Sequence, residues 1–445
     1  MPESTRAGRA ASGMFSSLGI RSFRWVWLAA LSGNSGRFAV ILVAGWEAYR
    51  LGDHSSLWPS LVSMLLLVPS MFFGLFAGSL ADRFNRAHLA AAGQFVNVLG
   101  CATAAGIAIT GHLDLSNLLL LTAVVGIGNS VQGPAWQAMI PDLVGPERLL
   151  NASMATRIAQ QGAELTGPAV GTAVLAVYGP GPTFLLCAAF YAAGVAMLLH
   201  VRRSVVVPVW SGKRQGPLAP VAQGLSYVRG QAPIGTLMLW VGLHCSLTMA
   251  SFGILPAVAA ANLHGNASAY GFLLTAFGLG SVLGPLLLMW LGDLVPAVMI
   301  LVVSGILSGL PLVSLGLVHN ETVALVSSAL AGGAQAVFMA GIFSSTQGSS
   351  IDAMRGRVAS IQLSLTTGAM GLTSLGWGAL VGILSPGLVL ALPGSVFVLA
   401  CIPFALGSGR ITEALQRQRL SQAADRVSAI IPVLARTDGA ERAEV

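Results

Sequence analysis

Three charged residues stand inside segments of the chain that are otherwise apolar. Arg157 and Glu164 occur in the segment RIAQQGAELTGPAVGT at residues 157–172, and Arg37 occurs in the first apolar segment. On an α-helix, two residues seven positions apart lie within roughly 20° of the same face. A charged side chain at the centre of a bilayer costs about 2.5 to 3.5 kcal/mol and therefore faces protein or water. These charges predict a polar, functional interior.

Arg37 and Glu164 are predicted to lie at the same depth in a membrane. Each follows the expected inner end of its segment by about 14 residues, which corresponds to roughly 21 Å of helix. Their charges are opposite, so we expect an ion pair between the two helices, although the sequence leaves open whether the side chains touch. Arg157 lies nearer the inner surface, where it would either attract an anionic part of a substrate or meet lipid headgroups.

Proton antiport would have to use an ionisable group within the spans. The acids there are Glu47 and Glu164, and His244 is the histidine well inside the membrane. Loss of water favours the neutral form of a carboxyl, whereas a nearby arginine favours the charged form. If Arg37 holds Glu164 charged, Glu47 is the better proton carrier. The alternatives are that Glu47 is an interfacial acid that stays hydrated and that His244 is a hydrogen-bonded structural residue.

The composition places the positioning elements in a bilayer. Of the 445 residues, 55% are hydrophobic and 9% are charged, and the mean hydropathy is +0.78. A helix needs roughly 20 apolar residues to cross a bilayer. We therefore predict an all-α polytopic membrane protein with twelve spans, near residues 23–50, 57–80, 89–110, 115–138, 150–177, 182–201, 233–262, 269–292, 296–317, 321–345, 358–384 and 387–408.

The basic residues follow the positive-inside rule, which accounts for the net charge of +7 without a nucleic-acid partner. Lys and Arg concentrate in one set of loops and in both termini, whereas the opposite loops contain neither, apart from Arg50 beside the first. Both termini are therefore expected in the cytoplasm, and the first span is expected to be an uncleaved anchor. The four cysteines fall inside spans without paired spacing and predict no disulfide.

A loop signature follows the second span. Gly78, Leu80, Asp82, Arg83 and Arg86 resemble the G-x-L-x-D-R-x-x-R signature of the major facilitator superfamily, at the place where that family carries it. The resemblance covers the N-terminal half of the chain, and in the C-terminal half it rests on the layout and on the loop SSIDAMRGRVAS.

The fourth span and the loop after it are more specific. The stretch GNSVQGPAWQAMIPDLVGPERLLNAS resembles the transmembrane secretion effector branch of that superfamily, which contains siderophore and macrolide exporters. Gly167, Pro168 and Gly171 resemble the antiporter signature of the fifth span, where they predict a kink and close helix packing. Asn85 and Ala87 depart from the loop signature, since a glycine or acid and a second basic residue are usual there.

The resemblance implies the major facilitator fold, with two six-helix halves that hold substrate near the middle of the membrane. The halves would be residues 23–201 and 233–408, with a cytoplasmic N-terminus at 1–22, a cytoplasmic linker at 202–232 and a cytoplasmic tail at 409–445. Within the linker, the pattern around Leu225 and Val228 predicts a short amphipathic helix.

The resemblance also implies a gate between the second and eleventh spans. Asp82 and Arg83 would meet Asp352, Arg355 and Arg357 on the inner side, with Gly78 and Arg86 in the same signature. The alternative is that these arginines mainly keep their loops inside.

One departure from the resembled pattern concerns the central charges. In that branch an acid usually stands at the position of Arg37 and an arginine at that of Glu164, so the two signs are exchanged here. An ion pair would tolerate this exchange. Substrate contacts are expected on the cavity faces of the first and fourth spans, from Asn34, Trp46, Asn129, Gln132 and Trp136.

The predicted function is secondary active transport, by alternating access, as a proton-coupled exporter of amphipathic small molecules. We expect a monomer in the bacterial inner membrane whose partners are its substrate, protons and lipids. The alternatives are a lipid or lysophospholipid flippase and a non-transporting sensor. The sequence contains no metal-ligand cluster, nucleophile with a nearby base, or phosphate-binding loop, so neither an enzyme nor a cofactor is expected.

Overall fold

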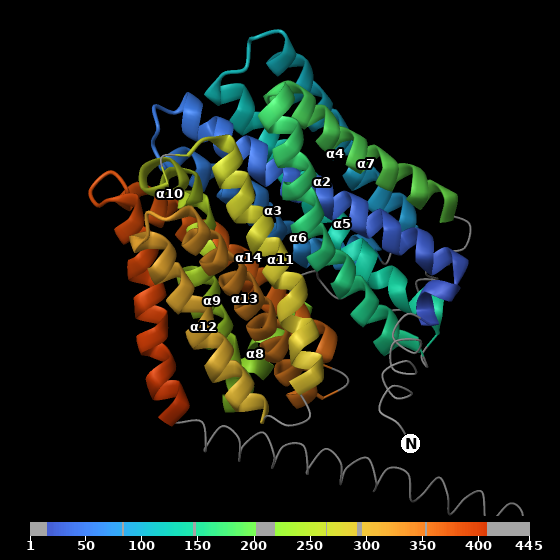
Figure 1. Ribbon diagram of the computed structural model, residues 1–445. Helices are drawn as coiled ribbons and strands as arrows, with labels where there is room; N and C mark the ends of the chain where they lie inside the picture. Colours follow the sequence, from blue (N-terminus) through green and yellow to red (C-terminus); the bar gives the residue numbers. More distant parts are fainter. Residues whose placement is uncertain are drawn as a thin grey trace, which may run out of the picture.

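The computed structural model describes residues 16–81, 84–145, 148–201, 219–263, 265–291, 296–351 and 354–406. The predicted tail at 409–445 and most of the predicted N-terminus and linker lie outside these ranges. In the described part the regular structure is helical (Figure 1). Its first elements are η1 (Ser16–Gly19), α2 (Arg21–Leu51), α3 (Leu57–Ala81), α4 (Arg86–Ile109), α5 (Leu115–Val144), α6 (Leu149–Tyr178) and α7 (Pro180–Val201).

The remaining elements follow the predicted linker. They are α8 (Ala219–Gly230), α9 (Ala232–His244), η3 (Cys245–Met249), η4 (Ala250–Ile254), α10 (Leu255–Asn262), α11 (Ala267–Leu291), α12 (Ala297–Leu317), α13 (Glu321–Ser349), α14 (Arg355–Leu380) and a last helix, Pro386–Leu406. The short helix predicted around Leu225 and Val228 is confirmed as α8. The seventh predicted span is not one regular helix, because a π-helical turn (η3) and a 3-10 turn (η4) interrupt it.

Nine helices of the described residues are long and apolar enough to cross a membrane. The predicted all-α polytopic membrane protein is therefore confirmed. Two long helices fall outside this set, namely α6 and α14, whereas α3 is apolar over Leu57–Phe72. Helix α6 packs extensively against α2 on one side and α11 on the other, and α14 packs extensively against α3. A helix that meets protein rather than lipid needs fewer apolar residues.

Two groups of helices meet along these contacts. In the first group α2 packs against α6 and α7, and α4 packs against α5 and α7; in the second, α13 packs against α11 and α12. Contacts of α3 with α14 and of α6 with α11 join the groups. In Figure 1 the helices up to α7, coloured blue to green, lie to the upper right, and the yellow to red helices lie to the lower left.

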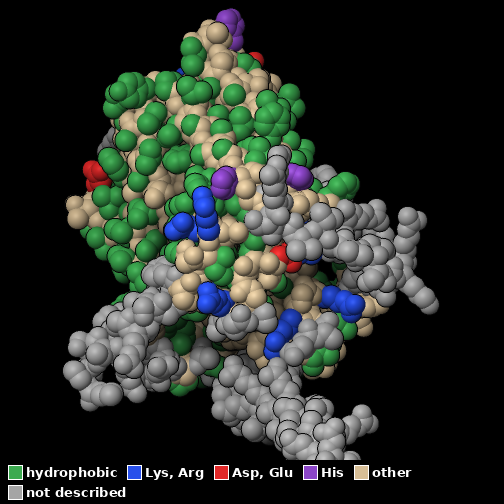
Figure 2. All heavy atoms as spheres, turned by 90° about the vertical axis from the view of Figure 1, so that its right-hand side faces the viewer, with side chains coloured by type: hydrophobic (Ala, Val, Ile, Leu, Met, Phe, Trp, Pro, Cys, Tyr) green, Lys and Arg blue, Asp and Glu red, His purple; other side chains and the backbone are tan. Residues whose placement is uncertain are grey.

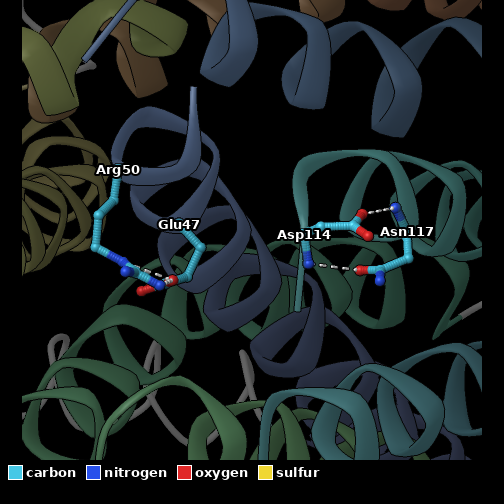
Figure 3. Close-up of polar contacts among 4 residues, drawn as sticks. All are labelled: Glu47, Arg50, Asp114 and Asn117. Carbon is cyan, nitrogen blue, oxygen red and sulfur yellow. Dashed lines mark hydrogen bonds and ion pairs between the residues drawn. The ribbon is translucent and has the colours of Figure 1, made fainter. Parts of the chain in front are cut away.

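Side-chain caps start several helices. Asn85 accepts hydrogen bonds from the backbone N–H groups of Ala87 and His88 and so caps α4. Asp114 and Asn117 form a capping box at the start of α5 (Figure 3). An N-cap of this kind satisfies N–H groups that the helix leaves unpaired and contributes about 1 kcal/mol. The asparagine at position 85, a departure from the loop signature, therefore has a structural role.

Glycines allow α6 to approach its neighbours on two sides. A Cβ at Gly167 would meet the backbone carbonyl of Ser35 in α2, and one at Gly171 would meet Leu42. On the other side, a Cβ on Gly278 of α11 would collide with the backbone of Glu164. The helix continues through Pro168 without a break. Glu164 thus stands where the two groups of helices cross.

Apolar packing joins the two groups at one end of the molecule. The largest buried cluster draws on both groups, with Leu42 and Leu66 from the first and Ile254, Tyr270 and Leu312 from the second. Toward the opposite end, the buried clusters of the described residues each stay within one group. We call the first the closed end; it carries the loops at residues 52–56 and 263–266. Arg37 lies just before Ala39, where this cluster begins in α2.

Candidate functional site

Glu164 lies partly buried at the crossing of α6 and α11. The Ser281 side chain of α11 lies near its carboxylate. The Ser281 hydroxyl is also within 2.9 Å of the Gly278 carbonyl oxygen, to which it donates. One hydroxyl carries one proton, so it can serve only one of these acceptors at a time.

Arg37 and Arg157 flank Glu164 without pairing with it. The carboxylate interacts electrostatically with both guanidinium groups, but in the described part of the chain the ion pairs join other residues, Glu47 with Arg50 and Arg86 with Asp142. The predicted ion pair between Arg37 and Glu164 is therefore not formed in this structure. The physical reason is the crossing helix: α11 meets α6 at Glu164 and supplies Ser281 as its partner.

The two arginines contact aromatic rings instead of acids. The Cζ atom of Arg157 lies 4.9 Å from the ring centroid of Phe343 in α13, and that of Arg37 lies 5.4 Å from the ring of Phe38. Arg157 is exposed. The Nε atom of Arg37 is buried and has no hydrogen-bond partner, and an unpaired buried donor costs about 1 to 3 kcal/mol. The cluster of Arg37, Arg157 and Glu164 thus carries one more positive than negative charge.

Glu47 is paired, contrary to the situation expected for a proton carrier. It is 3% exposed, and Arg50 donates to its Oε2 atom from Nη2 at 2.5 Å and from Nε at 2.9 Å (Figure 3). The Arg50 side chain is 52% exposed and reaches back one turn from the end of α2. In this structure it is therefore Glu47, and not Glu164, that has a cation in direct contact. The pairing removes the reason for preferring Glu47 over Glu164 as the proton carrier.

His244 is enclosed by aromatic side chains. Its ring stacks on Phe338 of α13 at a centroid distance of 4.2 Å, and Phe397 of the last helix lies at 5.1 Å. Neither ring nitrogen has a hydrogen-bond partner. His244 is the last residue of α9, immediately before the π-helical turn. The alternative of a structural histidine held by hydrogen bonds is therefore wrong, because in the described part of the chain the ring is held by aromatic contacts.

Asn129 and Gln132 are hydrogen-bonded inside the first helix group. The Oδ1 atom of Asn129 accepts from Asn97 Nδ2 at 2.9 Å, from Gln132 Nε2 at 2.7 Å and from the Tyr191 hydroxyl at 3.2 Å. All four side chains are buried. These two residues belong to an amide cluster that links α4, α5 and α7, and their place at a substrate cavity stays a prediction. The sequence reasoning missed Asn97 and Tyr191, although an Asn within an apolar segment is itself a signal.

The other predicted cavity residues have separate positions. Asn34 donates to the Ala30 carbonyl of its own helix at 2.8 Å, and Trp136 is buried against Gly33. Trp46 stacks on Tyr270 of α11 at 6.5 Å, which places it at the contact between the two groups. Of the five, Trp46 is the one whose ring reaches across this contact.

The predicted gate falls partly outside the described residues. Asp82, Arg83 and Asp352 lie there, and Gly78 lies near the end of α3. Arg86 donates from Nη1 to Asp142 Oδ2 at 2.6 Å and to the Ala138 carbonyl at 2.8 Å, which ties α4 to α5.

Two described arginines stand at the start of α14. Arg355 donates to the Gln347 carbonyl at 3.3 Å, and Arg357 lies 3.3 Å from the sulfur of Met354. The loop signature does not predict Asp142 as the partner of Arg86.

Long apolar helices around an interior cluster of charges are the architecture of a membrane transporter, and the described residues hold no group of three or more His, Cys, Asp or Glu side chains that could bind a metal. The fold is that of the major facilitator transporters: a POT family transporter solved with 5-aminolevulinic acid superposes with a TM-score of 0.72 at 12% identity, covering 88% of this chain and 97% of that one. The chain belongs to the transmembrane secretion effector family, whose sequence model matches residues 12–431.

Curated relatives are similar at modest identity. The Staphyloferrin A transporter of Staphylococcus aureus (strain NCTC 8325 / PS 47) is 24% identical over 285 residues, which are 63% of this chain and 70% of that protein. The Enterobactin exporter EntS of Escherichia coli O1:K1 / APEC is 27% identical over 311 residues, which are 69% of this chain and 73% of that protein. The chain is therefore a transporter and not an enzyme, as predicted, and neither the flippase nor the sensor alternative is favoured.

Proposed function

We propose that the protein is a secondary transporter that exports amphipathic small molecules by alternating access, coupled to protons. The proposal places it as a monomer in the bacterial inner membrane with both termini in the cytoplasm. It treats residues 23–201 and 233–408 as two six-helix halves. The family and the names of the siderophore-transporting relatives support export of such compounds.

The observation that carries alternating access is the unequal packing of the two ends. One apolar cluster spans both groups at the closed end, whereas the clusters toward the opposite end stay separate. Lys and Arg gather in the lower half of the face in Figure 2, and hydrophobic side chains cover most of its upper part. Because basic residues mark the cytoplasmic side, these features support a state that is closed outside.

Glu164 is the proposed site of proton coupling. It lacks the close cation that Glu47 has in Arg50, and it stands at the crossing of α6 and α11. Protonation would remove its charge and turn it into a donor. The carboxyl would then no longer need the Ser281 proton, which can stay on the Gly278 carbonyl. Protonation thus changes bonding at the contact that must rearrange when the two groups move.

Two experiments test this proposal. In cells with and without the protein, accumulation of a panel of amphipathic dyes, antibiotics and siderophores should be lower for at least one compound when the protein is present. In proteoliposomes loaded with that compound, its movement should carry protons in the wild type and in the Glu47→Gln variant, but not in Glu164→Gln. No difference for any compound would refute export, and proton movement in Glu164→Gln would refute the role of Glu164. Phospholipid scrambling in the same vesicles would indicate a flippase.

A further inference from the structure

Two guanidinium groups lie within electrostatic range of Glu164 without an acid bound to either. Arg37 and Arg157 make no ion pair or hydrogen bond with another residue in the described part of the chain. Their surroundings are two phenyl rings and one carboxylate at longer range, that of Glu164. Transport of a neutral molecule gives no reason for this excess of positive charge.

The positions of the arginines suit them to bind a ligand from two sides. Arg37 comes from α2 in the first group, whereas Arg157 of α6 reaches across to Phe343 of α13 in the second. A guanidinium over an aromatic face is held by its π-system, and its N–H donors, which lie in the guanidinium plane, remain available. Such a fork matches the two oxygens of a carboxylate, sulfonate or phosphate.

We propose that Arg37 and Arg157 bind an anionic group of the transported molecule, and that Glu164 is the counter-ion of the empty site. This inference rests on the proposed function and adds the chemical class of the substrate, an amphipathic organic anion. A cationic group would meet two positive charges and one negative charge, so the site disfavours it. A lipid phosphate has the same chemistry as a free anion, and the test below separates these sources.

The test compares 2-naphthoate with its neutral isostere 2-naphthamide. Unfolding of the purified full chain in a non-ionic detergent is followed with a thiol-reactive dye, because the four cysteines are buried and react only on unfolding. The rise in the unfolding temperature with ligand concentration gives an apparent Kd. We expect 2-naphthoate to stabilise the protein and 2-naphthamide to have little effect.

Removing a positive charge and removing the negative charge should change the Kd for 2-naphthoate in opposite directions. Arg157→Gln should weaken 2-naphthoate binding by about tenfold, and Arg157→Lys by no more than about threefold. Glu164→Gln should tighten binding by about threefold or more, because it removes the competing negative charge. The matched control is Arg24→Gln, which removes an exposed arginine from α2 and should leave the Kd unchanged. Arg157 is exposed, so its variants test the idea even if an Arg37 variant fails to fold.

Three outcomes would overturn the proposal: equal stabilisation by the neutral isostere, no stabilisation by 2-naphthoate, or an unchanged Kd in Arg157→Gln. A fourth concerns the source of the anion. If phosphatidylglycerol stabilises the protein through Arg157 and 2-naphthoate does not, the arginines hold a lipid and not a substrate. These are binding measurements in detergent, so their failure leaves the export test standing, and failure of export in cells leaves the binding result standing.

Discussion

At the residue scale, Glu47 and Glu164 differ in how near a guanidinium group lies to the carboxylate. Glu47 is bound by Arg50, whose side chain is half exposed, so water screens the pair and its net contribution is about 1 kcal/mol or less. Glu164 has two arginines within electrostatic range and the Ser281 hydroxyl near it. The first acid is tied to the end of its own helix, and the second lies at the contact between the two groups of helices.

The amide cluster gives a stability prediction. Asn129→Ala removes the oxygen that accepts from Asn97, Gln132 and Tyr191. Each buried donor left unpaired costs about 1 to 3 kcal/mol, so we expect at least about 3 kcal/mol of destabilisation. The control Tyr191→Phe removes a single donor of the same cluster and should cost about 1 kcal/mol. Detergent-denaturant unfolding of both variants measures the difference, and equal losses would contradict the assigned hydrogen bonds.

At the element scale, α6 is held between α2 and α11 by backbone contacts that glycines permit. Gly167 and Gly171 serve the contact with α2 inside one group, whereas Gly271 and Gly278 serve the contact with the other group, at Thr172 and Glu164. The small residues at the contact between the two groups of helices are therefore in α11. They are not in the Gly-Pro segment of α6.

A methyl group should therefore have different effects at two glycines. Gly278→Ala places a Cβ against the backbone of Glu164, and overpacking of this kind costs about 1 to 3 kcal/mol. Gly106→Ala in α4 meets no atom within 4 Å and should stabilise the helix by about 0.5 to 1 kcal/mol. Thermal unfolding midpoints of the two variants would show the opposite signs. A neutral Gly278→Ala would mean that α6 and α11 do not cross this closely.

At the scale of the whole molecule, the closed end is a contact between two groups that each have their own core. Ser60 of α3 meets Gly253 of η4 and Gly378 of α14, so three helices converge there. The π-helical and 3-10 turns directly precede this point in the chain. Irregular turns of this kind often mark positions where a helix bends.

A disulfide across this contact should stop transport. The double variant Leu67→Cys, Gly371→Cys between α3 and α14, made in a background without the native cysteines, should oxidise because a Cβ at Gly371 would lie 3.4 Å from the Leu67 Cβ, close to the separation in a disulfide. We expect transport to be lost on oxidation and restored by dithiothreitol, with the transport of each single variant insensitive to the oxidant. Full transport by the cross-linked protein would show that this end does not open.

Much of the fold follows from the sequence because lipid imposes length and polarity on each span. The predicted span 57–80 corresponds to α3 (Leu57–Ala81), and 387–408 to the helix Pro386–Leu406. Hydropathy did not predict the interrupted seventh span, since π-helical and 3-10 turns carry the same apolar residues as an α-helix.

The site was only partly predictable. Helical spacing and depth brought Arg37, Arg157 and Glu164 to one region, and all three do interact. The partner of Glu164 was not foreseen, because Ser281 comes from a helix more than 100 residues away and serines in spans are common. Pairing of Arg50 with Glu47 depends on a rotamer at the end of α2, which no pattern encodes.

The excess positive charge beside Glu164 also bears on how the membrane potential acts on transport. If a monoanion enters the site and Glu164 takes up a proton, the net charge of the site is the same when loaded as when empty. A potential of 100 mV does about 2.3 kcal/mol of work on each charge that crosses, but here it would have no net charge to move. Proton and anion would then move in the same direction, so export would run down the gradient of the anion itself. A potassium diffusion potential imposed with valinomycin should leave the export rate unchanged, whereas a pH gradient should alter it.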